Sequence, residues 1–211
     1  VCSSDRDGVL IGASDAGEAL TLTRRALAEH PGRPLFEAAF QRDGVLIRTD
    51  LLLPEADGYR LREVKASTRL KDEHRDDCAI QTWVIGAALP LTGVELAHVD
   101  TAFVYPGNGD YRGLLKSNPL DGDVASLLPA VPQWIADARA TLAGAEPTIA
   151  PGPQCHSPYE CPFQSHCGTG QLSQPDYPLG CLPRLSGQRL QGLVDQGITE
   201  VRHIPADYPL T

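Results

Sequence analysis

The stretch from residue 44 to residue 66 constrains the fold more than any other part of the chain. Two apolar runs rich in β-branched residues lie on either side of the turn-forming cluster Pro54-Glu55-Ala56-Asp57-Gly58. This pattern is typical of a β-hairpin. With a four-residue loop over 55–58, Pro54 faces Tyr59, and counting back along both strands fixes every other facing pair.

In this register Asp50 lies opposite Glu63, and Lys65 lies on the same face two residues further on. Facing Cβ atoms are roughly 5 Å apart, so two facing carboxylates repel each other. A hard divalent cation such as Mg²⁺ removes that conflict, and a lysine beside it can hold a phosphate or polarise an attacking water. The hairpin therefore predicts a metal site. The alternative is an exposed hairpin face that carries ordinary surface charges.

Length and composition fit one domain with additions, or one domain and a small tail, because the chain has 211 residues. It contains no run long enough to span a membrane and no secretory start. The chain begins at Val1 and contains no Met, so we expect a fragment that lacks its native N-terminus. The net charge of −9 argues against a protein that coats nucleic acid, but it does not exclude a metal-assisted enzyme.

The positive residues are unevenly distributed along the sequence. Six of the eighteen Lys and Arg residues fall within residues 60–75: Arg60, Arg62, Lys65, Arg69, Lys71 and Arg75. We expect this group to surround the hairpin site, with Arg69, Lys71 and the nearby His74 as candidate substrate-binding residues. The alternative is a solvated loop.

Helices and strands are expected on both sides of the hairpin. Residues 16–30 form an amphipathic pattern that Ser14 or Asp15 can cap, and residues 34–40 alternate as a strand that places Glu37 beside the hairpin. The clearest helical pattern covers residues 74–88. There His74, Asp77 and Gln81 can share one face, which we expect to lie over Lys65, so that Gln81 meets substrate or water. The remaining expected elements are strands over 96–105 and 111–117, a turn at 106–110, and helices over 121–142, interrupted near Pro129 and Pro132, and 186–196, ended by Gly197.

Cysteine spacing indicates a second metal site. Of the six cysteines, Cys155, Cys161 and Cys167 are separated by two equal gaps within a Pro-rich stretch that has little periodicity. Such a stretch cannot build a packed core, so ligation of iron or zinc by thiolates would order it. A fourth ligand must come from elsewhere. His156 and His166 leave zinc open, and free thiols are the remaining alternative. We expect three parts: a core over 1–146, a Cys-rich segment over 147–170 and a helical tail over 171–211, whose Gly-Ile-Thr turn suits a helical hairpin.

The order of these features resembles the PD-(D/E)XK nuclease superfamily. A strand with Asp50, a turn, a strand with Glu63-Val64-Lys65 and a helix with Gln81 follow that family's signature, and three cysteines come after it. The cysteines resemble those of the iron–sulfur branch of RecB-type exonucleases, which includes the CRISPR-adaptation exonucleases. Several stretches look like an uncharacterised bacterial family in that branch, and the resemblance covers residues 9–211.

The resemblance implies a fold and an active site. The fold is of the α/β (α+β) class, with a restriction-endonuclease-like core in which helices flank a mixed central sheet. The implied roles are Asp50 and Glu63 on Mg²⁺ or Mn²⁺, Val64 as a backbone carbonyl ligand, Lys65 beside the attacking water and Glu37 as an additional acidic residue. Gln81 matches the Gln of the Gln-x-x-x-Tyr motif. Because Ile85 stands where Tyr is usual, the DNA contact of that aromatic is not implied.

The resemblance also implies a structural [4Fe–4S] cluster on Cys155, Cys161 and Cys167, with Zn²⁺ as the alternative. The family's first cysteine precedes the core, so the fourth ligand is Cys2, Cys181 or a residue upstream of the fragment. The implied activity is that of a cytoplasmic Mg/Mn-dependent deoxyribonuclease, in particular an exonuclease acting on single-stranded DNA or duplex ends. A degenerate nucleic-acid-binding module and a zinc-stabilised interaction domain are the alternatives.

Overall fold

The computed structural model describes residues 8–156, 159–168, 176–183, 185 and 187–208. Its described residues divide into two compact units, Val1–Ala140 and Thr141–Thr211, with the boundary inside one helix. The predicted division into three parts stays a prediction. Among the described residues, no helix combines the length and the apolar character that crossing a membrane requires.

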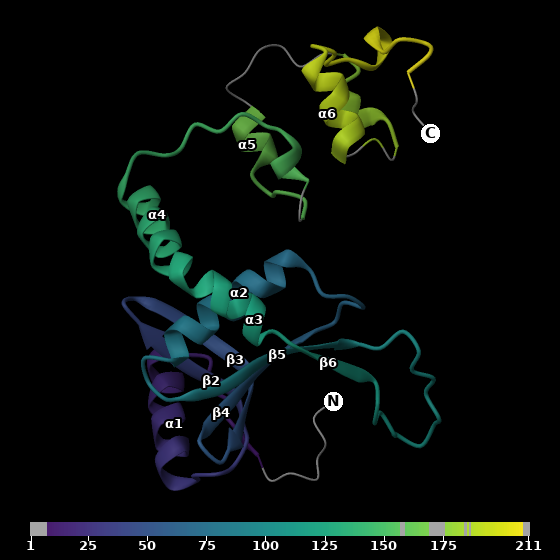
Figure 1. The fold of residues 1–211 in the computed structure, drawn as a ribbon. Helices are drawn as coiled ribbons and strands as arrows, with labels where there is room; N and C mark the ends of the chain where they lie inside the picture. The colour runs from purple at the N-terminus through teal and green to yellow at the C-terminus, as the bar shows by residue number, and fades with distance from the viewer. Residues whose placement is uncertain (1–7, 157–158, 169–175, 184, 186, 209–211) are drawn as a thin grey trace. The chain divides into compact units, whose positions relative to one another are not determined.

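The first unit is built on a six-stranded mixed sheet with the strand order β1-β2-β3-β4-β5-β6 (Figure 1). Strands β1 and β2 are parallel, as are β4 and β5, and the other neighbours are antiparallel. The strands are β1 Val9–Leu10, β2 Leu35–Arg42, β3 Val45–Glu55, β4 Gly58–Lys65, β5 Leu91–Val99 and β6 Leu115–Pro119. The predicted mixed sheet flanked by helices, and with it the α+β class, is confirmed.

The predicted hairpin is β3 and β4, and its register is confirmed. Pro54 pairs with Tyr59, and the ladder runs back to Leu51 and Arg62. The four-residue loop is wrong, because Glu55 and Gly58 also pair and leave a turn of two residues. Gly58 has a φ of 154°, and a Cβ there would lie 2.5 Å from the Pro90 carbonyl oxygen, so this position needs glycine.

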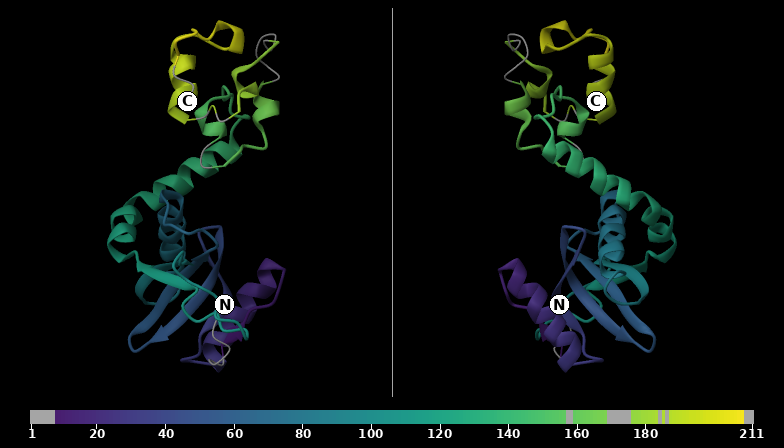
Figure 2. Two further views of the ribbon diagram at one scale, coloured as in Figure 1. Left: turned by 90° about the vertical axis from the view of Figure 1, so that its right-hand side faces the viewer. Right: turned by 90° about the vertical axis from the view of Figure 1, so that its left-hand side faces the viewer.

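Helices α1 Ala16–Glu29 and α2 Asp72–Ile85 form where the periodicity predicts them, and the strands separate them in the side views of Figure 2. The Asp15 side chain caps α1 by accepting a hydrogen bond from the Glu18 N–H, as predicted. Helix α1 packs on β2, and α2 packs on β2, β3 and β5. Because α2 connects two parallel neighbours, β4 and β5, it forms a crossover that returns over the sheet.

The core lies between the sheet and its helices. Leu35, Leu52, Leu61 and Leu96 of four successive strands are fully buried, and Ile85 of α2 packs in the same cluster. Fully burying one such side chain is worth about 1.5–3 kcal/mol. Ile85 is therefore a core residue, and its side chain is not placed to contact a substrate.

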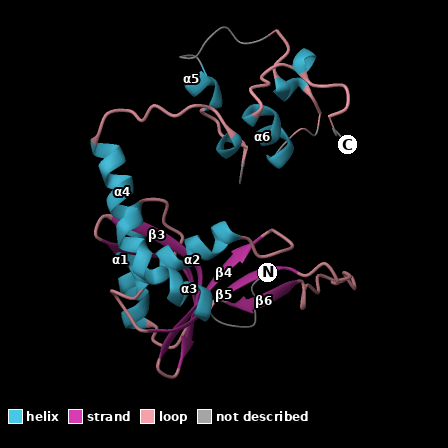
Figure 3. Cartoon of the chain, turned by 45° about the horizontal axis from the view of Figure 1, so that its top comes forward, coloured by secondary structure: helices cyan, strands magenta, loops and turns pink. Residues whose placement is uncertain are grey.

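Two predicted strands have different limits from those we expected. The strand predicted over 96–105 is β5, which begins at Leu91 and ends at Val99, and the strand predicted over 111–117 is β6. The Asp100 side chain accepts a hydrogen bond from the Ala102 N–H and turns the chain away from the sheet. Residues 100–114 therefore form a loop that extends beyond the ends of both strands (Figure 3).

The remaining helical segments are α3 Asp121–Leu127, η1 Leu128–Ala130, α4 Val131–Ala143, η2 Pro153–Cys155, α5 Gln164–Gly168, η3 Leu179–Cys181, α6 Gly187–Asp195 and η4 Val201–His203. The predicted interruption near Pro129 is confirmed by η1, which stands between α3 and α4. The predicted end of the tail helix is also confirmed, because Gly197 follows α6 with a φ of 74°.

Candidate active site

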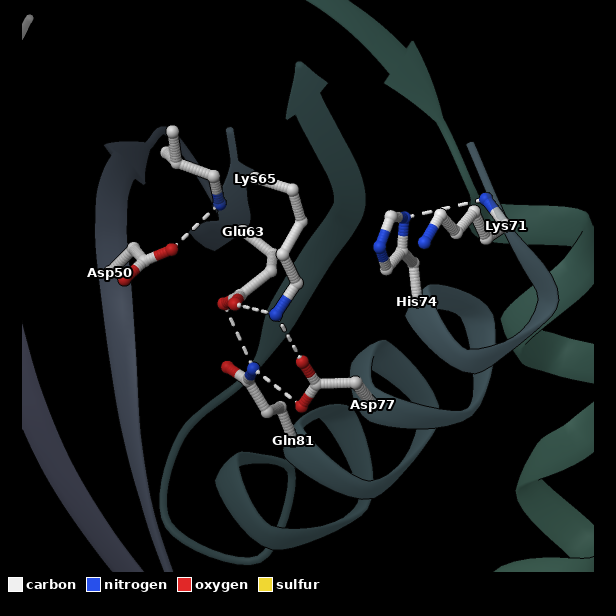
Figure 4. A network of polar contacts seen from close by, with 8 residues as sticks. Asp50, Glu63, Lys65, Lys71, His74, Asp77 and Gln81 are labelled. Carbon is white, nitrogen blue, oxygen red and sulfur yellow. Dashed lines mark hydrogen bonds and ion pairs between the residues drawn. The ribbon is translucent and has the colours of Figure 1, made fainter. Parts of the chain in front are cut away.

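A connected polar network lies where β4 meets α2 (Figure 4). The Lys65 ammonium nitrogen lies 2.7 Å from Glu63 Oε1 and 2.6 Å from Asp77 Oδ2. The Gln81 amide nitrogen donates to Glu63 Oε2 at 2.9 Å and to Asp77 Oδ1 at 3.1 Å. We predicted that the helix face carrying Asp77 and Gln81 lies over Lys65, and these contacts confirm it.

Asp50 borders this network from β3, at a break in the sheet. The β3–β4 ladder ends at Leu51, and the β2–β3 ladder passes from Phe36–Leu51 to Ala38–Thr49 without the pair that would join Asp50 to Glu37. The Asp50 carboxylate instead accepts a hydrogen bond from the Val64 N–H at 2.7 Å. The two strands therefore separate where the carboxylates of Asp50 and Glu63 lie.

Glu37 accounts for part of this break. Its φ of 58° lies in the left-handed region, where a non-glycine residue carries strain. Its carboxylate is about half exposed and lies 3.9 Å from the Arg48 guanidinium. No hydrogen bond among the described residues joins it to Lys65 or Gln81. Glu37 thus neighbours Asp50 by register, but it stands outside the network.

Burial controls the electrostatics of the network. It raises the pKa of the Glu63 carboxyl, and the charges of Asp50 and Asp77 act in the same direction, while hydrogen bonds from Lys65 and Gln81 oppose it. Burial also disfavours the charge on Lys65, but the hydrogen bonds to Asp77 and Glu63 outweigh it and raise the pKa of Lys65. The site therefore holds a protonated lysine between carboxylates that repel one another.

The donor atoms fit a hard divalent cation. Asp50 and Glu63 supply carboxylate oxygens, and Gln81 Oε1 is buried without a hydrogen-bond partner among the described residues. In Figure 4 this oxygen lies on the side of the amide away from Asp77. A buried polar atom without a partner is costly, so an ion or an ordered water next to it would remove a penalty. Mg²⁺ is usually held by one or two carboxylates and keeps several waters.

In the part of the chain that the structure describes, no group of three or more His, Cys, Asp and Glu side chains is arranged to hold a metal. The hairpin therefore offers a pair of carboxylates, which a backbone carbonyl such as that of Val64 would supplement. For the predicted cluster, Cys155 is buried, Cys161 and Cys167 are partly exposed and Cys181 is exposed. Cys2 lies outside the described residues. The iron–sulfur and zinc assignments stay predictions.

The three predicted substrate-binding residues precede or begin α2. His74 is buried, and its Nδ1 accepts the Lys71 N–H at 3.3 Å at the start of the helix. Burial lowers the pKa of His74, so the neutral ring is favoured. Lys71 lies 3.3 Å from Glu73. Arg69 is exposed, and none of the described acids forms an ion pair with it.

The six Lys and Arg residues that lie close together in the sequence, within residues 60–75, do not all surround the site in the structure. Arg60 and Arg62 alternate with Leu61 and Glu63 along β4, so they point to the opposite face of the sheet from Lys65. The acids paired with these cations are Glu55 for Arg60, Glu95 for Arg62, and Asp72 and Asp123 for Arg75. The expectation of six cations around the site is wrong, because alternation and ion pairing separate them.

Asp77 is a network residue for which the sequence predicted no role of its own. Its position one helical turn before Gln81 placed it on the correct face, but its two contacts depend on where α2 packs against β4. The signal was therefore the spacing of four residues between Asp77 and Gln81.

Comparison with known proteins adds little to this geometry. No family model matches the chain, and no curated protein matches it. Among solved structures, the crystal structure of SSO0001 aligns with a TM-score of 0.30 and 13% identity over 61% of this chain and 60% of that one. A likeness at this level supports no conclusion about fold or function.

Proposed function

We propose that this protein is a metal-dependent nuclease that hydrolyses phosphodiester bonds in DNA. The observation that supports the proposal best is the meeting of Asp50, Glu63, Lys65 and Gln81 where β3 and β4 separate. In this proposal the activity belongs to a cytoplasmic member of the PD-(D/E)XK superfamily, and a structural iron–sulfur cluster stabilises the Cys-rich segment.

Each side chain would have a distinct role. Asp50 and Glu63 would hold Mg²⁺ or Mn²⁺, which when bound supplies Lewis acidity and activates water for attack on phosphorus. The Lys65 ammonium would stabilise negative charge that develops on the phosphate oxygens. Gln81 would orient Glu63 through the hydrogen bond between its amide nitrogen and Oε2. Arg69, which lies just before α2, would contact the DNA backbone.

The test is divalent-dependent cleavage of linear single-stranded and double-stranded DNA by anaerobically purified protein. We expect cleavage in Mn²⁺ that is lost in Asp50→Asn and Lys65→Ala and is retained in Lys116→Ala, which changes an exposed lysine on β6. Closed circular DNA should resist an exonuclease. Equal cleavage by the wild type and Asp50→Asn would refute the proposal.

A degenerate nucleic-acid-binding module is the second candidate, because Ile85, which stands where the family motif has Tyr, is buried in the core. Binding of DNA with no cleavage in either Mg²⁺ or Mn²⁺ would favour it. In that case Arg69→Ala should reduce the salt dependence of binding by about one unit of slope. Arg62→Ala, on the opposite face, should leave that slope unchanged.

A further inference from the structure

Lys65 is held by two carboxylates that differ in their surroundings. Glu63 is a strand residue with 8% of its side chain exposed, whereas Asp77 comes from α2 with 39% exposed. Both carboxylate oxygens lie within 2.7 Å of the ammonium nitrogen. Glu63 thus serves as the partner of a lysine and, under the proposed function, as a ligand of a divalent cation.

These two roles of Glu63 compete. A carboxylate that binds a divalent cation directs its oxygens at the ion, and the ion repels a lysine ammonium placed beside it. Lys65 then needs another anionic partner, or it must leave the site. Asp77 already lies 2.6 Å from the ammonium and comes from a different element, so it can keep this contact while Glu63 moves.

We propose that Asp77 is a positioning residue that holds the Lys65 ammonium in place when Glu63 binds the divalent cation. This inference rests on the proposed function, because it assumes that Glu63 binds a metal ion. The three carboxylates would then divide their tasks. Asp50 and Glu63 face the ion from two strands, and Asp77 balances the charge of Lys65 from the helix.

The Gln81 amide supports this division. Its nitrogen donates to both Glu63 Oε2 and Asp77 Oδ1, so it fixes the orientation of both carboxylates relative to each other. Asp77 and Gln81 are one helical turn apart on α2, which presents them together to β4. The competing explanation is an ordinary, partly exposed ion pair. Such a pair contributes little to stability and would have no influence on metal binding.

The first experiment measures Mn²⁺ affinity by calorimetry for the wild type, Asp77→Asn and Asp76→Asn. Asp76 is the matched control, because it is an exposed aspartate on the same helix and its substitution makes the same change in net charge. We expect Asp77→Asn to weaken Mn²⁺ binding about 10–100-fold, as removal of an outer-shell partner typically does. Asp76→Asn should change it less than about twofold, since exposed charges are screened.

The second experiment observes Lys65 directly. The chain has three lysines, Lys65, Lys71 and Lys116, so ¹⁵N-lysine labelling gives at most three ammonium signals. Hydrogen bonds that slow exchange with water make such a signal visible. The Lys65 signal, assigned by its loss in Lys65→Arg, should persist in saturating Mg²⁺ in the wild type and in Asp76→Asn. It should disappear in Mg²⁺-saturated Asp77→Asn.

Each outcome bears on the inference. If the wild type binds Mn²⁺ through Glu63, shown by loss of binding in Glu63→Gln, and Asp77→Asn binds it equally well, the inference is overturned and the proposed metal site stands. If the wild type binds no Mn²⁺, the proposed function and the inference fail together. A Lys65 signal that persists in Mg²⁺-saturated Asp77→Asn also overturns the inference. Weaker Mn²⁺ binding by Asp77→Asn, together with loss of the Lys65 signal in that variant, supports the inference.

Discussion

Replacing Lys65 with alanine tests the electrostatic description of the site without any assumption about catalysis. The substitution removes the only cation within hydrogen-bonding distance of Glu63 in the described structure. The Glu63 carboxylate would then remain buried near the charges of Asp50 and Asp77, with the Gln81 amide as its donor. We therefore expect a loss of stability that depends on whether Glu63 is charged.

The size of this loss follows from burial. Removing one partner of a fully buried ion pair costs about 3–5 kcal/mol, because the other charge is left uncompensated. Here the Lys65 side chain is 28% exposed and Glu63 can bind a proton, so the cost is smaller. We expect about 2–3 kcal/mol near neutral pH, which for a unit of this size lowers Tm by about 5–10 °C.

The loss should shrink in acid and in the presence of metal. Without Lys65 the pKa of Glu63 rises further, so at about pH 5 a larger fraction of Glu63 is neutral and the missing partner matters less. A divalent cation would replace the missing positive charge. Saturating Mn²⁺ should therefore stabilise Lys65→Ala more than it stabilises the wild type, by mass action on the folded state.

Urea unfolding, followed by circular dichroism at both pH values, measures these free energies. Lys116→Ala is the matched control, because it removes an exposed lysine from a strand of the same sheet. If Lys65→Ala and Lys116→Ala unfold alike near neutral pH, the ion pair contributes nothing and the reasoning is refuted. A loss of equal size at both pH values would show that packing of the lysine stem, and not charge, causes it.

Three further predictions concern single residues. Burial raises the pKa of Glu63, so the folded state binds a proton at this carboxyl more tightly than the unfolded chain does. Proton binding therefore stabilises the folded state fully below the unfolded pKa of about 4.3, and this contribution is lost as pH rises through the folded pKa. Glu63→Gln should therefore gain stability relative to the wild type between about pH 4 and pH 8 in urea unfolding, and parallel pH curves would contradict this. Leu61→Ala should lower the free energy of unfolding by about 2–5 kcal/mol, because Leu61 is fully buried. Leu46→Ala, at an exposed position, should lower it by less than about 1 kcal/mol. Equal losses would refute the assignment of the core. Burial raises the pKa of the Cys78 thiol to about 12. Iodoacetamide at about pH 8 should therefore modify exposed Cys181 and spare Cys78, as peptide mass spectrometry would show. Comparable labelling of the two thiols would be evidence against the burial of Cys78.

Local signals in the sequence predicted the hairpin and the principal helices. The turn cluster after Leu53 fixed the register of β3 and β4, since a two-residue period leaves few ways to pair two strands across a short turn. The Asp15 cap and the left-handed Gly197 marked the start of α1 and the region where α6 ends. These features depend on residues within a few positions of one another.

The end of β5 was predicted incorrectly because it depends on partners distant in the chain. Thr101, Phe103 and Tyr105 alternate as a strand does, but β6 pairs only with the residues from Glu95 to Val99. Beyond them the Asp100 turn satisfies the backbone locally. Alternation alone cannot show whether a neighbouring strand is present to pair.

The sequence by itself determined which residues could form the site: Asp50 opposite Glu63, Lys65 beside it and Gln81 on a helix face that follows. Only the tertiary structure decided how they interact. Packing of α2 on the sheet brought Asp77 to Lys65, strand separation left Asp50 to accept the Val64 N–H, and pairing of β4 with β5 brought Glu95 to Arg62. The reason is physical. Register and capping are set by short-range geometry, whereas ion pairs and burial depend on which elements meet after the chain has folded.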